Sequence, residues 1–108
     1  MLLSATSIIG DNVRNGAGED LGKIEDLMVC TVNGSVKYAV LSFGGFLGMG
    51  DKLFAVPLET LTLNTAEKCF VMNVTKERLE NAPGFDKDNW PDTASVEWQE
   101  SISNYYIP

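Results

Sequence analysis

The fold is decided by residues 36–57, VKYAVLSFGGFLGMGDKLFAVP, which predict two apolar strands joined by a glycine-rich loop. Pro57 ends the second strand because proline has no backbone donor for the sheet. The glycines of the loop can adopt backbone angles that other residues avoid, and we expect them to turn the chain: Gly44, Gly45, Gly48 and Gly50. Surface loops are usually polar, whereas this loop also carries three large apolar side chains: Phe46, Leu47 and Met49.

The whole chain has 108 residues, 44% of them hydrophobic, and a net charge of −7. This length and composition predict one globular barrel domain with a tail. Because fifteen acidic residues outnumber eight basic ones, the surface should repel phosphate backbones and anionic lipids, and we expect no direct contact with nucleic acid. No signal-peptide pattern or membrane-spanning apolar run is visible, which predicts a cytoplasmic protein with no membrane span.

Short strands and turn signals alternate along the first 82 residues. The predicted strands cover residues 8–13, 21–32, 36–43, 52–56 and 68–74. Asn33 and Gly34 follow the second strand, and this pair is typical of a type I′ hairpin turn, which needs positive φ at both positions. Residues 58–63 predict a single turn or short helix, and Thr75 predicts the N-cap of a helix over residues 76–81.

Strand 36–43 is apolar on both faces. Val36, Tyr38 and Val40 share one face, and Ala39, Leu41 and Phe43 share the other. In so small an antiparallel protein, this pattern predicts a curled sheet whose inner face is core and whose outer face is covered by another element. The predicted fold is therefore mostly β, with a small closed or partly open antiparallel β-barrel over residues 1–82 and short helices.

Residues 83–108 form a tail that differs from the barrel in composition. It contains both tryptophans, two of the three tyrosines, and five acidic residues against one lysine. Residues 92–95 can start a helix, and the apolar side chains that follow fall on one face of it: Trp98, Ile102, Tyr105 and Tyr106. This amphipathic C-terminal helix must dock either on its own barrel or on a partner subunit, and the sequence leaves both alternatives open.

No motif in the sequence predicts catalysis, a cofactor or a metal. The glycine loop lacks the Gly-Lys-Ser/Thr order of a phosphate-binding loop and leads into a strand instead of a helix. Residues 86–92 resemble a calcium loop in spacing, but Trp90 and Pro91 stand where an oxygen donor and a glycine belong. With no histidine in the chain, the usual general base at neutral pH is missing. We therefore expect no enzymatic activity.

The two cysteines, Cys30 and Cys69, each lie in an apolar strand-like run. Their spacing is not that of a metal site, and a chain without an export signal favours buried, reduced thiols. A disulfide between them remains an open alternative.

Several segments together resemble the PRC-barrel family. They are residues 22–26, the turn at 33–34, and residues 38–48, 51–57 and 82–86. The resemblance covers about residues 4–80 and implies the small barrel also found in the H subunit of the photosynthetic reaction centre and in the C-terminal half of a ribosome maturation factor. Those relatives act mainly through protein contacts, and the family motif carries no catalytic residues.

The resemblance and the apolar loop together predict a protein-interaction or assembly module that associates with itself, as a homodimer or a larger assembly. We expect contacts through the loop and the tail, at Phe43, Phe46, Leu47, Met49, Trp90, Trp98, Ile102, Tyr105 and Tyr106. One alternative is the binding of a small molecule or anion at the mouth of the barrel. Another is association with the ribosome or with RNA processing through a basic protein partner.

Overall fold

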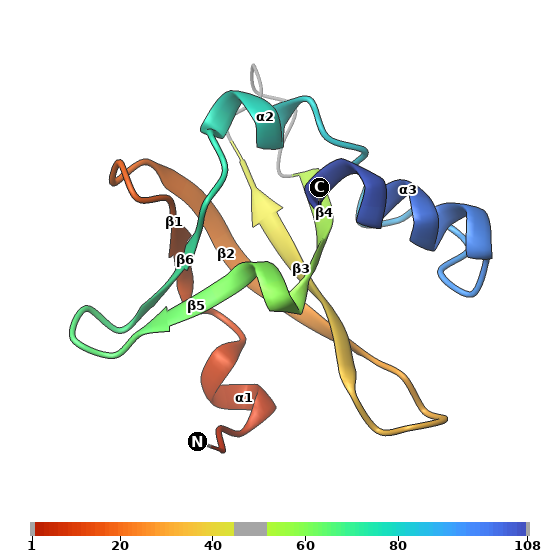
Figure 1. Ribbon diagram of the computed structural model, residues 1–108, viewed down its shortest axis with the longest axis horizontal. Helices are drawn as coiled ribbons and strands as arrows, with labels where there is room; N and C mark the ends of the chain where they lie inside the picture. The colour runs from red at the N-terminus through yellow and green to blue at the C-terminus, as the bar shows by residue number, and fades with distance from the viewer. Residues whose placement is uncertain (1, 45–51, 108) are drawn as a thin grey trace.

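Six strands form one sheet that curls into a half-barrel (Figure 1). The computed structural model describes residues 2–44 and 52–107. Across the sheet, the strand order is β4-β3-β2-β1-β6-β5. The strands are β1 Asn12–Arg14, β2 Asp20–Val29, β3 Val36–Phe43, β4 Lys52–Pro57, β5 Leu61–Asn64 and β6 Cys69–Met72. Because β4 and β5 stand at the two ends of this order and do not pair with each other within the described ranges, the barrel is partly open.

One strand pair departs from the predicted antiparallel pattern. β1 pairs antiparallel with β2 but parallel with β6, through Val13 beside Phe70 and Arg14 beside Val71. The chain enters β6 only after it reverses direction from β5, in a turn that includes Lys68 with a positive φ of 54°. This reversal points β6 the same way as β1. The antiparallel prediction is therefore wrong for this pair and confirmed for the other pairs of described strands.

Short helices flank the sheet. They are α1 Ala5–Ile8, the 3-10 turn η1 Leu58–Thr60, α2 Lys76–Glu80 and α3 Val96–Tyr106. Thr75 caps α2 as predicted, since its hydroxyl accepts a hydrogen bond from the Arg78 N–H at 3.1 Å. Ser95 caps α3 in the same way, accepting from the Trp98 N–H at 3.0 Å. The predicted C-terminal helix is thus present.

Two short segments differ from the prediction. The strand expected over residues 8–13 is wrong before Asn12, because Ser4 caps a helical turn over Ala5–Ile8 by accepting from the Ser7 N–H. In the second segment, the turn expected over residues 58–63 exists as η1, but the chain then continues into strand β5.

The β2–β3 hairpin is closed by a longer connection than the type I′ turn we expected. A type I′ turn needs positive φ at both Asn33 and Gly34. Gly34 has a positive φ of 75°, but Asn33 does not, since Lys68 is the only non-glycine residue with positive φ in the described chain. The Asn33 carboxamide oxygen instead accepts from the N–H and the hydroxyl of Ser35, at 3.0 and 2.7 Å. Cys30 and Ser35 pair through their backbones beyond it. Side-chain hydrogen bonding therefore replaces the tight turn.

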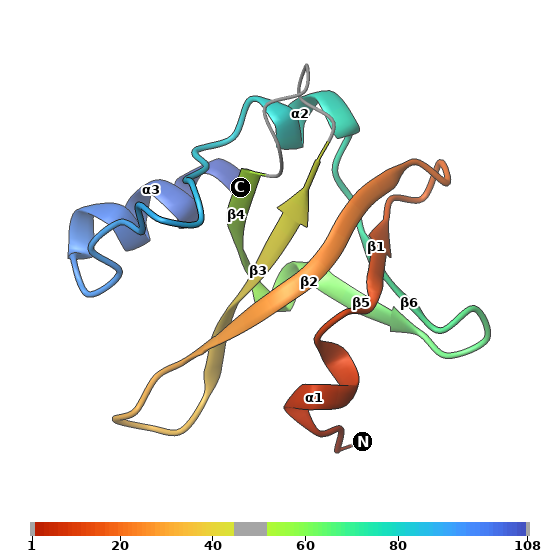
Figure 2. The same cartoon turned by 180° about the vertical axis from the view of Figure 1, so that it is seen from behind.

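The two faces of β3 pack into separate layers, as the sequence predicted. Ala39, Leu41 and Phe43 belong to the inner core. The inner core also includes Val13, Leu21, Ile24, Phe54, Val56, Phe70, Met72, Leu79 and Ala82. On the outer face, Tyr38 and Ala55 pack against Ile102 of α3, which runs beside β4 in both views (Figures 1 and 2). Helix α3 is therefore the element that covers the outside of the curled sheet.

Candidate functional site

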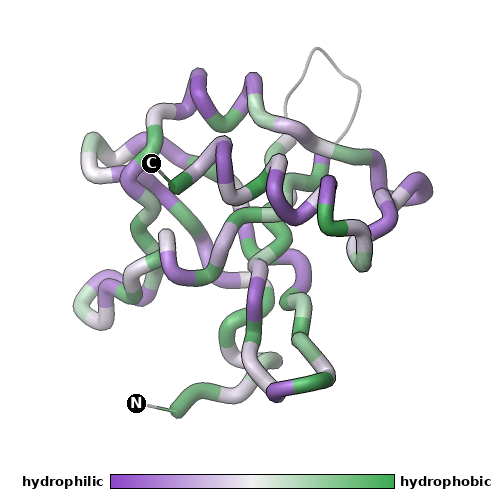
Figure 3. The backbone as a smooth tube through the Cα atoms, turned by 45° about the vertical axis from the view of Figure 1, so that its right-hand side comes forward, coloured by the Kyte–Doolittle hydropathy of each residue, from purple (hydrophilic) through white to green (hydrophobic). Residues whose placement is uncertain are grey.

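An open apolar groove of about 770 Å³ lies between the N-terminal arm, η1 and strands β5 and β6. Its lining includes Leu2, Leu3, Ile8, Leu58, Leu61 and Leu63. Leu61 and Leu63 share a face of β5 because side chains alternate along a strand. Leu2 is 99% exposed, and the arm that carries it is coloured hydrophobic in Figure 3. Among the described residues that line the groove, Glu59 alone carries a charged side chain.

A second apolar feature stands next to the groove. The tip of the β2–β3 hairpin carries Val32, which is 94% exposed, and β2 ends at Val29, which is 55% exposed. A hollow of about 240 Å³ lies between the hairpin and η1 and shares Leu58 and Glu59 with the groove; the rest of its lining is mixed and includes Asn33, Ser35 and Lys37. We call them together the basal surface: Leu2, Leu3, Val29, Val32, Leu58, Leu61 and Leu63. Exposed apolar side chains gathered on one side of a protein often mark a contact surface.

The predicted contact residues of the glycine loop mostly lie outside the described residues. These are Phe46, Leu47 and Met49, together with the turn glycines Gly45, Gly48 and Gly50. Gly44 is described and exposed, whereas Phe43 is only 6% exposed and belongs to the inner core. Lys76 lies over the Phe43 ring, with its Nζ 5.7 Å from the ring centroid. Phe43 therefore packs inside its own chain and presents little surface to a partner.

The predicted aromatic face of the tail packs against the chain's own sheet. Ile102 is 1% exposed, and the Trp98 ring meets the Tyr38 ring edge-on at 5.4 Å between centroids. Tyr105 and Tyr106 are half-buried. Trp90 pairs with Phe85 at 4.8 Å and is the most exposed of the predicted tail residues. Within this structure, the tail therefore docks on its own barrel.

A reciprocal contact fixes the end of α3 to α2. The Arg78 guanidinium donates to the backbone carbonyl of Tyr105, and the Tyr105 hydroxyl donates to the backbone carbonyl of Arg78. The guanidinium carbon also lies 4.4 Å from the centroid of the Tyr105 ring, a cation–π arrangement. Because the hydrogen bonds run in both directions, the register between the two helices is well defined.

Tyr106, the neighbour of Tyr105, has an unusual environment. Its hydroxyl oxygen is buried and has no hydrogen-bond partner among the described residues. Burial, with a smaller contribution from nearby Tyr105, raises the pKa of the Tyr106 phenol well above the ordinary value, although Arg78 acts in the opposite direction. Burial also raises the pKa of Tyr38. Both phenols are therefore neutral at physiological pH.

The raised pKa of Tyr106 predicts a loss of stability in alkali. The unfolded chain releases the phenol proton near pH 10, whereas the folded chain holds it to higher pH, so the free energy of unfolding falls as pH rises above about 10. We expect Tyr106→Phe to lose less stability than wild type between pH 9 and pH 11 in urea unfolding. At pH 7, where both states are protonated, the two proteins should differ little. An equal loss in both proteins at high pH would contradict this assignment.

The cysteines are free in the structure. Cys69 is buried as expected, but Cys30 is only partly buried, because β2 ends at Val29 and leaves Cys30 in the hairpin connection. Backbone hydrogen bonds from Asn33 and then Val32 hold the pKa of the Cys30 thiol below its usual value. The described residues contain no group of three or more side chains placed to hold a metal ion. Within the same residues, no helix has the length and apolar character to cross a membrane.

The basal surface was missed by the sequence analysis. The alternation of Leu61 and Leu63 after Leu58 was its available signal, but those residues were expected to form a turn or short helix. Once they form a strand, the alternation places both leucines on one face, and the fold brings the N-terminal arm across to them.

A comparison with protein families finds that the PRC-barrel domain model matches residues 2–79. This range agrees with the resemblance over about residues 4–80. It spans the six described strands, helix α1 and most of helix α2. No curated protein matches the chain. Since the matched range covers most of the sequence and the structure has the curled sheet that the match implies, the chain belongs to the PRC-barrel domain family.

Proposed function

We propose that this protein is a non-catalytic interaction module that associates with a second copy of itself through the basal surface. What supports it is that an open apolar groove and an exposed apolar hairpin flank the same hollow. The hairpin tip is convex and the groove is concave, so a twofold axis can place each hairpin in the groove of the other copy. The absence of histidine from the sequence supports a role without acid–base catalysis.

The exposed side chains set the strength of this contact. The exposed fractions of Leu2, Leu3, Val29 and Val32 amount to about three fully exposed side chains per copy. Burying them on both copies contributes roughly 9–18 kcal/mol, against an association cost of about 4–15 kcal/mol. A surplus of about 4–8 kcal/mol corresponds to a dissociation constant between about 1 mM and about 1 μM. The dimer should therefore form at tens to hundreds of micromolar protein.

Net charge gives the association a characteristic salt dependence. Each copy carries a charge of −7, so two copies repel each other. Within the described part of the chain, the groove is lined by one charged side chain, Glu59, and the adjoining hollow adds Lys37. Added salt screens the repulsion and strengthens apolar contact. We expect the dimer to be more populated at high salt than at low salt, opposite to an interface held by ion pairs.

Sedimentation velocity with a matched pair of variants tests the proposal. Val32→Asp puts a charge at the exposed hairpin tip, where it should not disturb the fold, and should shift the protein from dimer to monomer. Thr31→Asp adds the same charge to the neighbouring exposed residue outside the basal surface and should remain dimeric. A wild-type protein that stays monomeric up to hundreds of micromolar at high salt would contradict self-association. Identical behaviour of the two variants would contradict the surface.

Other expectations from the sequence accompany this proposal. A cytoplasmic location and association with the ribosome through a basic protein partner remain predictions. Charge complementarity between the acidic chain and a basic partner supports the second of these. Unlike self-association, such a contact should weaken as salt is added. The sign of the salt dependence therefore distinguishes the two partners.

A further inference from the structure

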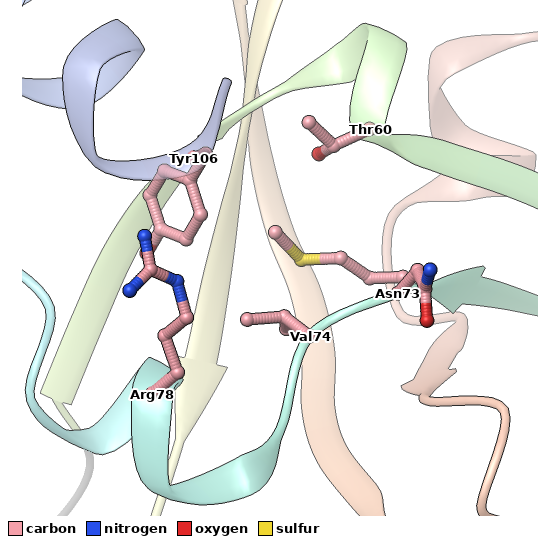
Figure 4. A pocket seen from close by; sticks show the side chains of 6 residues that line it. Thr60, Asn73, Val74, Arg78 and Tyr106 are labelled. Carbon is pink, nitrogen blue, oxygen red and sulfur yellow. The ribbon is translucent and has the colours of Figure 1, made fainter. Parts of the chain in front are cut away.

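A second hollow, separate from the basal surface, lies where α2, the end of α3, η1 and the end of β6 meet (Figure 4). It has a volume of about 250 Å³ and is lined by Thr60, Met72, Asn73, Val74, Arg78 and Tyr106. Figure 4 shows Arg78 reaching from α2 toward the ring of Tyr106. The lining thus combines a cation, a phenol and a carboxamide with two apolar side chains.

The Arg78 guanidinium has more N–H donors than its hydrogen bond to Tyr105 uses. It has five N–H donors, and one of its NH₂ groups donates to the backbone carbonyl of Tyr105. The chain has nearly twice as many acidic as basic residues, yet no described carboxylate lies at salt-bridge distance from Arg78. Stacking on Tyr105 fixes the guanidinium in place. A fixed cation without a carboxylate partner is suited to bind an oxyanion.

A neighbouring polar group also matches an oxygen acceptor. The buried Tyr106 hydroxyl lacks a partner among the described residues, and a buried donor without an acceptor destabilises a fold unless something else supplies one. Because the phenol keeps its proton at neutral pH, it is available as a donor. Asn73 also lines the hollow, but its carboxamide lies on the other side of Met72 from Arg78 and Tyr106 (Figure 4).

We propose that this hollow binds a small carboxylate with a short apolar chain. The carboxylate would accept from Arg78, with Tyr106 as a further donor, and the chain would lie against Met72 and Val74. The size of the hollow admits only a ligand of few atoms, and so few contacts give a dissociation constant on the order of 1 mM. This site shares no lining residue with the groove of the basal surface, so carboxylate binding and self-association can be tested separately.

An NMR titration of the full chain with sodium butyrate tests the site, with butyramide as the uncharged probe of similar shape. At constant ionic strength, butyrate should cause saturable shifts of the backbone amides of Asn73, Val74, Arg78 and Tyr106. Butyramide should cause shifts at least about tenfold weaker, because it offers no charge to the guanidinium. Absence of saturable shifts up to about 50 mM butyrate, well above the expected dissociation constant, would overturn the proposal.

Three variants separate specific binding from general charge and from folding. Arg78→Gln should weaken butyrate binding by about tenfold or more, whereas Lys76→Gln removes the same charge from the same helix and should change it less than about twofold. Tyr106→Phe should weaken binding by about three- to tenfold while its unfolding midpoint without butyrate stays unchanged or rises. Equal affinity of Arg78→Gln, Tyr106→Phe and wild type would assign the shifts elsewhere and overturn the proposal.

Discussion

Replacing Gly22 with alanine should cost about 4 kcal/mol or more of the free energy of unfolding, enough to unfold much of a domain of this size. Gly22 has a positive φ of 99°, and a Cβ built on it would lie 2.2 Å from the backbone oxygen of Ser42. Ser42 lies on the adjacent strand β3, next to Lys23 in the β2–β3 register. Because the obstacle is backbone, it cannot move without separating the two longest strands of the sheet.

Gly18→Ala is the matched control for this prediction. Gly18 has a similar φ of 84°, but a Cβ there would meet no atom within 4 Å. It therefore reports the cost of the backbone angle alone, about 1–2 kcal/mol. Urea unfolding followed by circular dichroism measures both variants. Equal losses would mean that β2 and β3 are not as close at Gly22 as the structure places them.

Shortening Ile102 to alanine should lower the free energy of unfolding by about 2–4 kcal/mol. Ile102 is 1% exposed and fills the space between Tyr38 and Ala55 on the outer face of the sheet, so its truncation leaves a cavity. Trp98 packs beside it on Tyr38, which makes tryptophan fluorescence a local probe of the same contact. Chemical unfolding followed by that fluorescence gives the measurement.

Val96→Ala is the control within the same helix. Val96 is 62% exposed, so its truncation should change stability by no more than about 0.5 kcal/mol. Similar small effects of both substitutions would contradict docking of α3 on its own chain. That result would instead favour a tail that docks on another subunit.

The curled sheet could be predicted because its cause lies in consecutive residues. The alternation of Val36, Tyr38 and Val40 with Ala39, Leu41 and Phe43 gives β3 two apolar faces. The second set belongs to the inner core, and Tyr38 of the first set packs against α3. The caps of α2 and α3 were predictable for the same reason, because a cap depends on a residue and the next three. The family resemblance extended these local signals to the whole barrel.

Features that depend on distant segments were not predictable in this way. The parallel pairing of β1 with β6 joins a strand of three residues to one more than fifty positions later, and no local pattern encodes it. The hairpin connection was misjudged because Asn33 satisfies the backbone through its side chain instead of adopting positive φ. Both candidate sites have this character, since each is assembled from at least three separate segments.

Isotope-filtered NMR on an equal mixture of ¹³C-labelled and unlabelled protein shows whether two copies meet through the basal surface. Such spectra detect only contacts between different copies. At hundreds of micromolar protein and high salt, we predict contacts from the methyl groups of Val32 to those of Leu61 and Leu63. Contacts that involve only α3, or no contacts between copies under these conditions, would contradict association through the basal surface.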